Sequence, residues 1–208
     1  MEEKYETLNF KRNKFYCLDN NRNNALYCFG RINSDITQLV NLIKINIKND
    51  DISMSQTLLL IKYLLLALKE ALKFISNVTK SELLMTLVPH QSKVIINELS
   101  SELVSPEESV DSFNARILSK IRDDIAHYSI ISKQTKNNAK LNEDLIKQDK
   151  NMMFKILKNE IEYEFFTDIL FIYNLNEVER TEMFRIAERI MLLSKQVLRN
   201  HIKNNIRE

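Results

Sequence analysis

Glycine and proline are almost absent from this chain, and their scarcity limits its possible folds more than any other feature. Gly30, Pro89 and Pro106 are their only occurrences among 208 residues. Gly-rich phosphate loops, dinucleotide-binding fingerprints and nucleophile elbows all require glycines at several fixed positions. Many short strands would also need frequent turns, whereas abundant Leu, Ile, Lys and Glu favour helices. The composition therefore predicts an all-α fold and argues against α/β folds that bind cofactors.

The spacing of apolar residues predicts one helical bundle behind a short arm. Residues 1–22 are polar and aromatic, and they suggest an irregular N-terminal arm or one short strand. Residues 23–208 predict a bundle of about five to six helices, interrupted by a polar loop at residues 133–151. The first two expected helices run from about Ala25 to Asn49 and from Ser53 or Ser55 to Val78. Residues 81–104 contain a further helical region, in which Pro89 ends or kinks a helix. Another helix is expected to begin at Ser105, and the last two are expected over Met152–Tyr173 and Glu177–Asn204.

The most apolar segment, the predicted helix from Ser53 or Ser55 to about Val78, is expected to be a buried core helix. A membrane span needs about twenty nearly uncharged residues. Here Lys62, Lys69, Glu70 and Lys73 interrupt the apolar run. We therefore expect no contact with a membrane.

Charge and cysteine content narrow the expected surroundings and ligands. Thirty basic and twenty-eight acidic side chains give a net charge of +2, which is no argument for or against a nucleic-acid partner. Cys17 and Cys28 form no metal-binding spacing with each other or with His90, so we expect free thiols and no metal. The first residues lack the layout of a secretory signal, and a cytoplasmic location is the simplest expectation. No cofactor is expected.

One segment concentrates chemically useful side chains: Ile121-Arg122-Asp123-Asp124-Ile125-Ala126-His127-Tyr128. The sequence before it predicts a helix start, because Ser105 can cap, Pro106 suits the first helical position and Glu108 completes a capping box. The spacing from Arg122 to His127 has little weight alone, since such pairs arise by chance. The weight comes from Asp123 after the arginine, from Ala126 and Tyr128 around the histidine, and from the helix that carries them.

This segment resembles the Arg-x4-6-His signature of the HEPN (higher eukaryotes and prokaryotes nucleotide-binding) domains, which often have a polar residue directly after the arginine. The resemblance implies a HEPN-like helical bundle over about Ala25 to Asn204. It also implies a metal-independent endoribonuclease of a toxin-antitoxin, abortive-infection or other defence system, acting as a homodimer with the two motifs facing each other. One branch of the family has Tyr two residues after the histidine, where this chain has Ser129.

Helix geometry and side-chain chemistry give these residues separate roles. Positions five apart on a helix differ by about 140°, so Arg122 and His127 face different directions, and a symmetric second subunit would complete one site. His127 can act as base or acid near neutral pH, and Arg122 can hold a phosphate by two hydrogen bonds. Asp123 is assigned to orienting Arg122 or a residue of the second subunit. A mechanism that uses the 2′-hydroxyl predicts cleavage of RNA, none of DNA, and a 2′,3′-cyclic phosphate end.

A second feature is a basic stripe at the end of the last predicted helix. Lys195, Arg199, Lys203 and Arg207 recur every four residues and would line one face, where they could contact an RNA backbone. Tyr128 is a further candidate contact with RNA. The same stripe is also typical of an ordinary solvated face, in which basic residues favour the helix C-terminus.

Two other interpretations stay open from the sequence. The chain can be a non-catalytic HEPN-like helical module that binds a partner protein or a nucleotide. In that case Arg122 and His127 serve only to balance the helix dipole and neighbouring charges. A helical metal-carboxylate enzyme is argued against, because no glutamate stands three residues before His90, His127 or His201.

Overall fold

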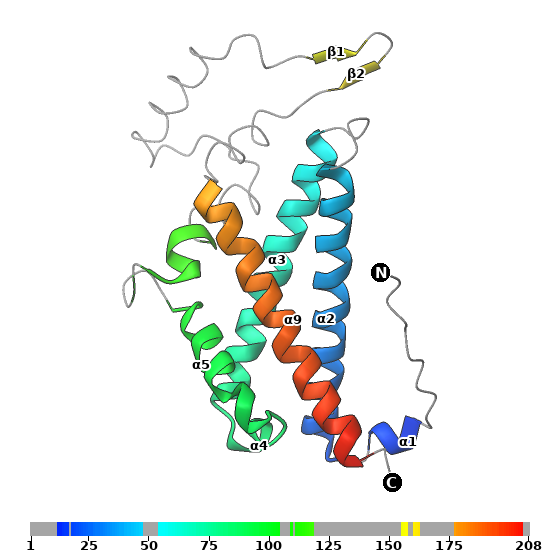
Figure 1. Cartoon of the computed structure of the whole chain (residues 1–208), viewed down its shortest axis with the longest axis vertical. Helices are drawn as coiled ribbons and strands as arrows, with labels where there is room; N and C mark the ends of the chain where they lie inside the picture. Colours follow the sequence, from blue (N-terminus) through cyan, green and yellow to red (C-terminus); the bar gives the residue numbers. More distant parts are fainter. Residues whose placement is uncertain are drawn as a thin grey trace.

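The computed structural model describes residues 12–16, 18–47, 54–104, 109, 111–118, 155–157, 160–162 and 177–205 (Figure 1). These residues are predominantly helical, which confirms the predicted all-α class. Two elements are not α-helices or strands, because η1 is a 3-10 helix and η2 a π-helix. The elements are α1 (Arg12–Phe15), α2 (Asn20–Ile47), α3 (Met54–Thr79), α4 (Glu82–Met85), η1 (His90–Ser92), α5 (Lys93–Ser101), η2 (Asn114–Leu118), β1 (Lys155–Leu157), β2 (Glu160–Glu162) and α9 (Glu177–Asn205).

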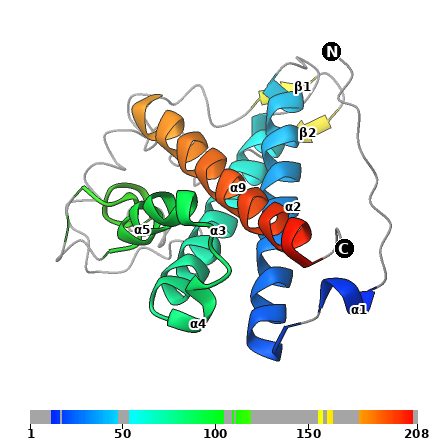
Figure 2. The ribbon, with the colours of Figure 1, turned by 60° about the horizontal axis from the view of Figure 1, so that its bottom comes forward.

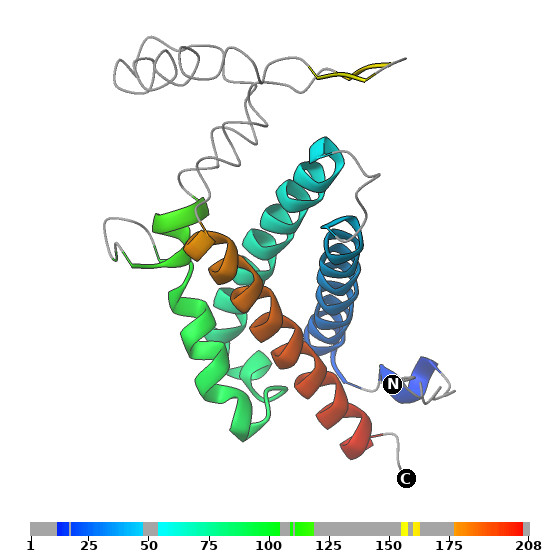
Figure 3. The ribbon, with the colours of Figure 1, turned by 45° about the horizontal axis from the view of Figure 1, so that its top comes forward.

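Three long helices, α2, α3 and α9, form the body of the bundle. Helix α9 runs between α2 on one side and α5 on the other, as Figures 2 and 3 show from two directions. Phe29 of α2 and Phe74 of α3 meet edge to face, with ring centroids 4.9 Å apart. Apolar side chains from α2, α3, α5 and α9 are fully buried in one shared core, among them Leu26, Phe29, Ile36, Leu68, Leu72, Ile96, Ile186 and Ile190.

Helix α2 begins at Asn20, five residues before the predicted start at Ala25. Asp19 caps it, because one carboxylate oxygen accepts a hydrogen bond from the backbone N–H of Arg22 at 3.0 Å. The same carboxylate pairs with the Arg22 guanidinium. The hydrogen bond from the Arg22 backbone, followed by that from its side chain, lowers the pKa of Asp19. The apolar periodicity locates the buried face of α2 but does not reveal this polar first turn.

Part of the expected N-terminal arm is also helical. Residues 12–15 form α1, where an irregular arm or a short strand was expected. Phe15 packs edge to face on His201 of α9, with ring centroids 5.0 Å apart. This contact with a distant helix explains why residues 12–15 alone did not indicate a helix.

Helix α3 covers the most apolar part of the chain and matches the prediction closely. It spans Met54–Thr79, and its residues Leu64, Leu68 and Leu72 are fully buried. In the described ranges no helix combines the length and the apolar character that crossing a membrane requires.

Pro89 interrupts the helical region 81–104 as predicted. Ser81 caps α4 by accepting a hydrogen bond from the Leu84 backbone N–H at 3.3 Å. The 3-10 helix η1 and helix α5 follow directly after Pro89. Proline has no backbone N–H to donate, so the chain restarts as a new helix at this point.

The helix expected from Ser105 begins later than its capping box indicates. Residues 109, 111 and 112 are not helical, and the described helical turns start at Phe113. Ser112 caps them, because its Oγ accepts a hydrogen bond from the Ala115 backbone N–H at 3.1 Å. Residues 105–108 themselves lie outside the described ranges. The prediction of a continuous helix from Ser105 is therefore wrong.

The predicted helix over Met152–Tyr173 is wrong where it can be compared with the structure. Strands β1 and β2 pair antiparallel, with Ile156 opposite Ile161. Glu160-Ile161-Glu162 alternates between charged and apolar residues with the period of a strand. The three-residue strands leave the all-α class unchanged.

Candidate functional site

The predicted catalytic residues Arg122, Asp123 and His127 lie outside the described residues, as does Tyr128. The structure does show how the chain is held shortly before them. Three side chains around η2, those of Phe113, Ile117 and Leu118, are buried in the core, and the first two have no exposed surface. The chain is thus fixed to the bundle up to four residues before Arg122.

Glu102, directly after α5, holds the start of this segment. One of its carboxylate oxygens accepts a hydrogen bond from the backbone N–H of Phe113 at 2.9 Å. Its backbone oxygen accepts another from Asn114 at 2.9 Å. Ser112 adds a third link, because its Oγ donates to the Val104 oxygen at 2.7 Å. The two bonds to Glu102 satisfy backbone N–H groups that the start of a helix otherwise leaves without partners.

Two ion pairs join α9 to Glu98 of α5 and to Glu102 directly after α5, and they balance charge along this side of the bundle. The Arg185 guanidinium donates to Glu102 at 3.2 Å and to Glu182 at 2.6 Å. Its hydrogen bond to Glu182 contributes most to raising the pKa of Arg185. Arg189 pairs with Glu98 of α5 one turn further along. Sequence spacing reveals Glu182, which is three residues from Arg185, but not Glu98 of α5 or Glu102 directly after α5, which are more than 80 residues away in the sequence.

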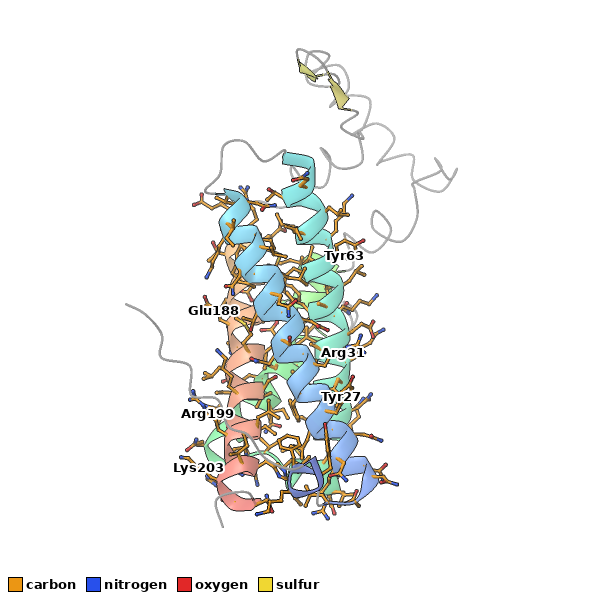
Figure 4. All side chains as sticks on the ribbon, turned by 90° about the vertical axis from the view of Figure 1, so that its right-hand side faces the viewer. Tyr27, Arg31, Tyr63, Glu188, Arg199 and Lys203 are labelled. Atoms are coloured by element: carbon orange, nitrogen blue, oxygen red, sulfur yellow. The ribbon has the colours of Figure 1, made fainter. Side chains whose placement is uncertain are left out.

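The C-terminal half of α9 has a different charge balance. Residues 177–188 contain four glutamates and two arginines, whereas residues 189–205 contain four basic residues and no acidic one. Lys195, Arg199 and Lys203 are exposed, and no hydrogen bond or ion pair joins them to another described residue. Figure 4 shows Arg199 and Lys203 on the outer side of α9, with Glu188 higher on the same helix. Arg207, the fourth member of the predicted stripe, lies outside the described residues.

This arrangement is not the one that most stabilises an isolated helix. Like charges four residues apart destabilise a helix by about 0.2–0.5 kcal/mol per pair. Lys195–Arg199 and Arg199–Lys203 are two such pairs. The helix dipole favours basic residues only within about the last turn, so it accounts for Lys203 but not for Lys195 or Arg199.

His201 has a structural role that the sequence did not indicate. The residue is buried, with 4% of its surface exposed. Nε2 lies 2.7 Å from the Phe15 backbone oxygen, which can only accept, so Nε2 donates. Nδ1 lies 3.0 Å from Nδ2 of Asn205. His201 therefore joins α1 to α9, with both ring nitrogens occupied.

Cys28 is a free, half-buried thiol that lines a shallow hollow of about 250 Å³ between α2, α3 and α4. Cys17 lies outside the described residues. Within the described ranges, no group of three or more His, Cys, Asp or Glu side chains is placed to hold a metal ion. The hollow is lined by Asn21, Asn24, Ala25, Cys28, Phe74, Ser81, Leu83 and Leu84.

No protein-family model, no curated protein and no solved structure matches this chain.

Proposed function

We propose that this chain is a HEPN-type endoribonuclease that cleaves RNA without a metal ion. The observation that carries the proposal is the segment Arg122-Asp123-Asp124-Ile125-Ala126-His127-Tyr128. A predominantly helical bundle and the burial of Ile117 and Leu118 just before this segment support it. A side chain that acts in catalysis needs a rigid base, and the buried residue Leu118 is four positions before Arg122 in the sequence.

In the proposed reaction, His127 removes the proton of a ribose 2′-hydroxyl. The 2′-oxygen then attacks the adjacent phosphorus and the bond to the 5′-oxygen breaks. Arg122 donates two hydrogen bonds to the phosphate oxygens, where negative charge increases in the transition state. The leaving 5′-oxygen takes its proton from water, and the hydroxide that remains takes back the proton held by His127, so one Arg122 and one His127 suffice for a site. The products are a 2′,3′-cyclic phosphate and a 5′-hydroxyl.

A second copy of the chain follows from the directions of the two side chains. Arg122 and His127 point about 140° apart if the segment is helical, so one helix alone does not aim both at one phosphate. A two-fold axis close to the segment brings two of each side chain around one cleft. We place Asp123 beside Arg122 as a positioning residue. The proposal includes a cytoplasmic toxin or defence effector, held in check by an antitoxin or another partner of its system.

The test is cleavage of an RNA oligonucleotide and of the DNA of the same sequence in the presence of a metal chelator. We expect the wild-type protein to cut the RNA and to leave the DNA intact, since DNA lacks the attacking hydroxyl. Mass spectrometry of the products should show 2′,3′-cyclic phosphate ends. Cleavage of the DNA, or of RNA only when a divalent metal is added, would contradict the mechanism. RNA that is bound but never cut would favour a non-catalytic binding module.

A further inference from the structure

We infer that Lys195, Arg199 and Lys203 form a docking surface for the phosphate backbone of an RNA strand, called here the α9 cationic row. The inference rests on the proposed function for the choice of RNA. Its basis in the structure is the position and the pairing of the three side chains. All three are exposed on the C-terminal half of α9.

The pairing pattern along α9 separates this row from the rest of the helix. Arg185 is paired with Glu102 directly after α5 and with Glu182 of α9, and Arg189 is paired with Glu98 of α5. Further toward the C-terminus of α9, the contact with this part of the chain is uncharged. There the hydroxyl of Ser92, directly before α5, donates a hydrogen bond to the side-chain oxygen of Gln196 at 2.6 Å. The row begins at this level of the helix. Its three charges therefore remain available to an anion from outside the described part of the bundle.

The sequence around the row also leaves its charges unbalanced. No Asp or Glu stands three or four residues from Lys195, Arg199 or Lys203, the positions that a helix brings side by side. Glu188 is the nearest acidic residue on α9, seven residues before Lys195. A solvated helix face usually mixes both signs of charge, as residues 177–188 do.

The spacing of the row suits a nucleic-acid strand. Residues four apart on an α-helix are separated by about 6 Å along its axis, which is comparable to the distance between successive phosphates. Residues 189–205 contain no Phe, Tyr or Trp, and His201 is buried, so no ring is offered for base stacking. The row is therefore expected to hold RNA through its backbone and to ignore sequence, while Arg122 and His127 supply the chemistry.

The experiment compares two triple variants that have the same net charge but carry their substitutions at different positions. Lys195→Glu/Arg199→Glu/Lys203→Glu removes the row. Lys44→Glu/Lys80→Glu/Lys93→Glu changes three other exposed lysines that have no described ion-pair partner. Each set shifts the net charge by six, from +2 to −4. Both are made in the His127→Ala background, so that an RNA oligonucleotide is bound without being cut.

The readout is the dissociation constant over a series of salt concentrations. Loss of three phosphate contacts should weaken binding on the order of 10-fold or more and reduce the slope of log K against log salt by about 2. The control triple variant should keep the wild-type slope. A glutamine version of the row, compared with wild type by circular dichroism and in binding, separates lost contacts from introduced repulsion or misfolding.

Equal losses in both triple variants would overturn the inference, because they would show a response to net charge alone. Wild-type affinity for RNA in the row variant would also overturn it. So would a row variant that binds RNA normally but no longer binds a protein partner. The binding measurement is independent of cleavage. If the wild-type protein cuts no RNA but the row variant still loses RNA affinity selectively, the docking surface stands and the proposed function fails.

Discussion

Replacing His127 with alanine is expected to reduce the rate of RNA cleavage by about 10²- to 10⁴-fold, the usual contribution of a general acid or base. The proposed reaction has a proton transfer at the attacking 2′-hydroxyl and another at the leaving 5′-oxygen. The first of them depends on His127, and alanine has no group that can accept the proton. The measurement is the single-turnover rate on an RNA oligonucleotide in a metal chelator.

His90 provides the matched control for this substitution. It is an exposed histidine of η1. His90→Ala should cleave RNA at the wild-type rate. His201 is unsuitable as a control, because its buried ring joins α1 to α9. If His127→Ala, with the circular dichroism spectrum of the wild type, cleaved RNA as fast as His90→Ala, the assignment of His127 would be wrong.

Replacing Phe29 with alanine is expected to lower the free energy of unfolding by about 3–5 kcal/mol, the range measured for large aromatic residues in cores. Phe29 has no exposed surface and meets Phe74 edge to face at 4.9 Å. The substitution removes apolar burial, opens a cavity between α2 and α3, and loses the contact of the two rings. Chemical denaturation followed by circular dichroism measures the change.

Tyr27 is the control on the same helix. Its side chain is 55% exposed. Tyr27→Ala should change the free energy of unfolding by no more than about 0.5 kcal/mol, as is usual for surface positions. Similar effects of the two substitutions would contradict the burial of Phe29 and the packing of α2 on α3.

The long helices were predictable because their own sequence determines them. Helix α9 was expected over Glu177–Asn204 and spans Glu177–Asn205. Its apolar residues recur on one face, and Asn174-Leu175-Asn176 separates it from the preceding apolar region. Ala25, Phe29, Ile36, Val40 and Ile43 of the predicted face of α2 are buried. Ile47, at the last position of that face, is 64% exposed, because α2 ends there.

The wrong predictions have a common physical cause. Each concerns an element whose structure depends on a partner distant in the sequence, or on a choice between two equivalent local signals. Ser105 and Ser112 are both good helix caps, and Glu102 favours the later start by accepting the Phe113 N–H. The strand Glu160–Glu162 becomes recognisable when it pairs with Lys155–Leu157. Helix α1 is held by His201, which is 186 residues from Phe15 in the sequence.

The same distinction applies to the candidate site. Features set by local spacing were predictable, and features set by another part of the bundle were not. The exposed face of Lys195, Arg199 and Lys203 was predictable, because four-residue spacing places side chains in a row. Their lack of a partner on a neighbouring helix was not predictable. It depends on the packing of α9, in which Glu102 and Glu98 pair with Arg185 and Arg189 instead. The roles of Arg122, Asp123 and His127 remain predictions from the motif.

A mixed dimer tests the central claim most directly, namely that Arg122 and His127 of two copies form one ribonuclease site. Arg122→Ala and His127→Ala chains with different affinity tags are co-expressed, and the dimer that carries both tags is purified. Each parent dimer lacks both copies of one side chain, whereas the mixed dimer keeps one arginine and one histidine. The account predicts that the mixed dimer cleaves RNA in chelator at least about 10-fold faster than either parent dimer. A mixed dimer as inactive as its parents, beside an active wild-type dimer, would contradict it.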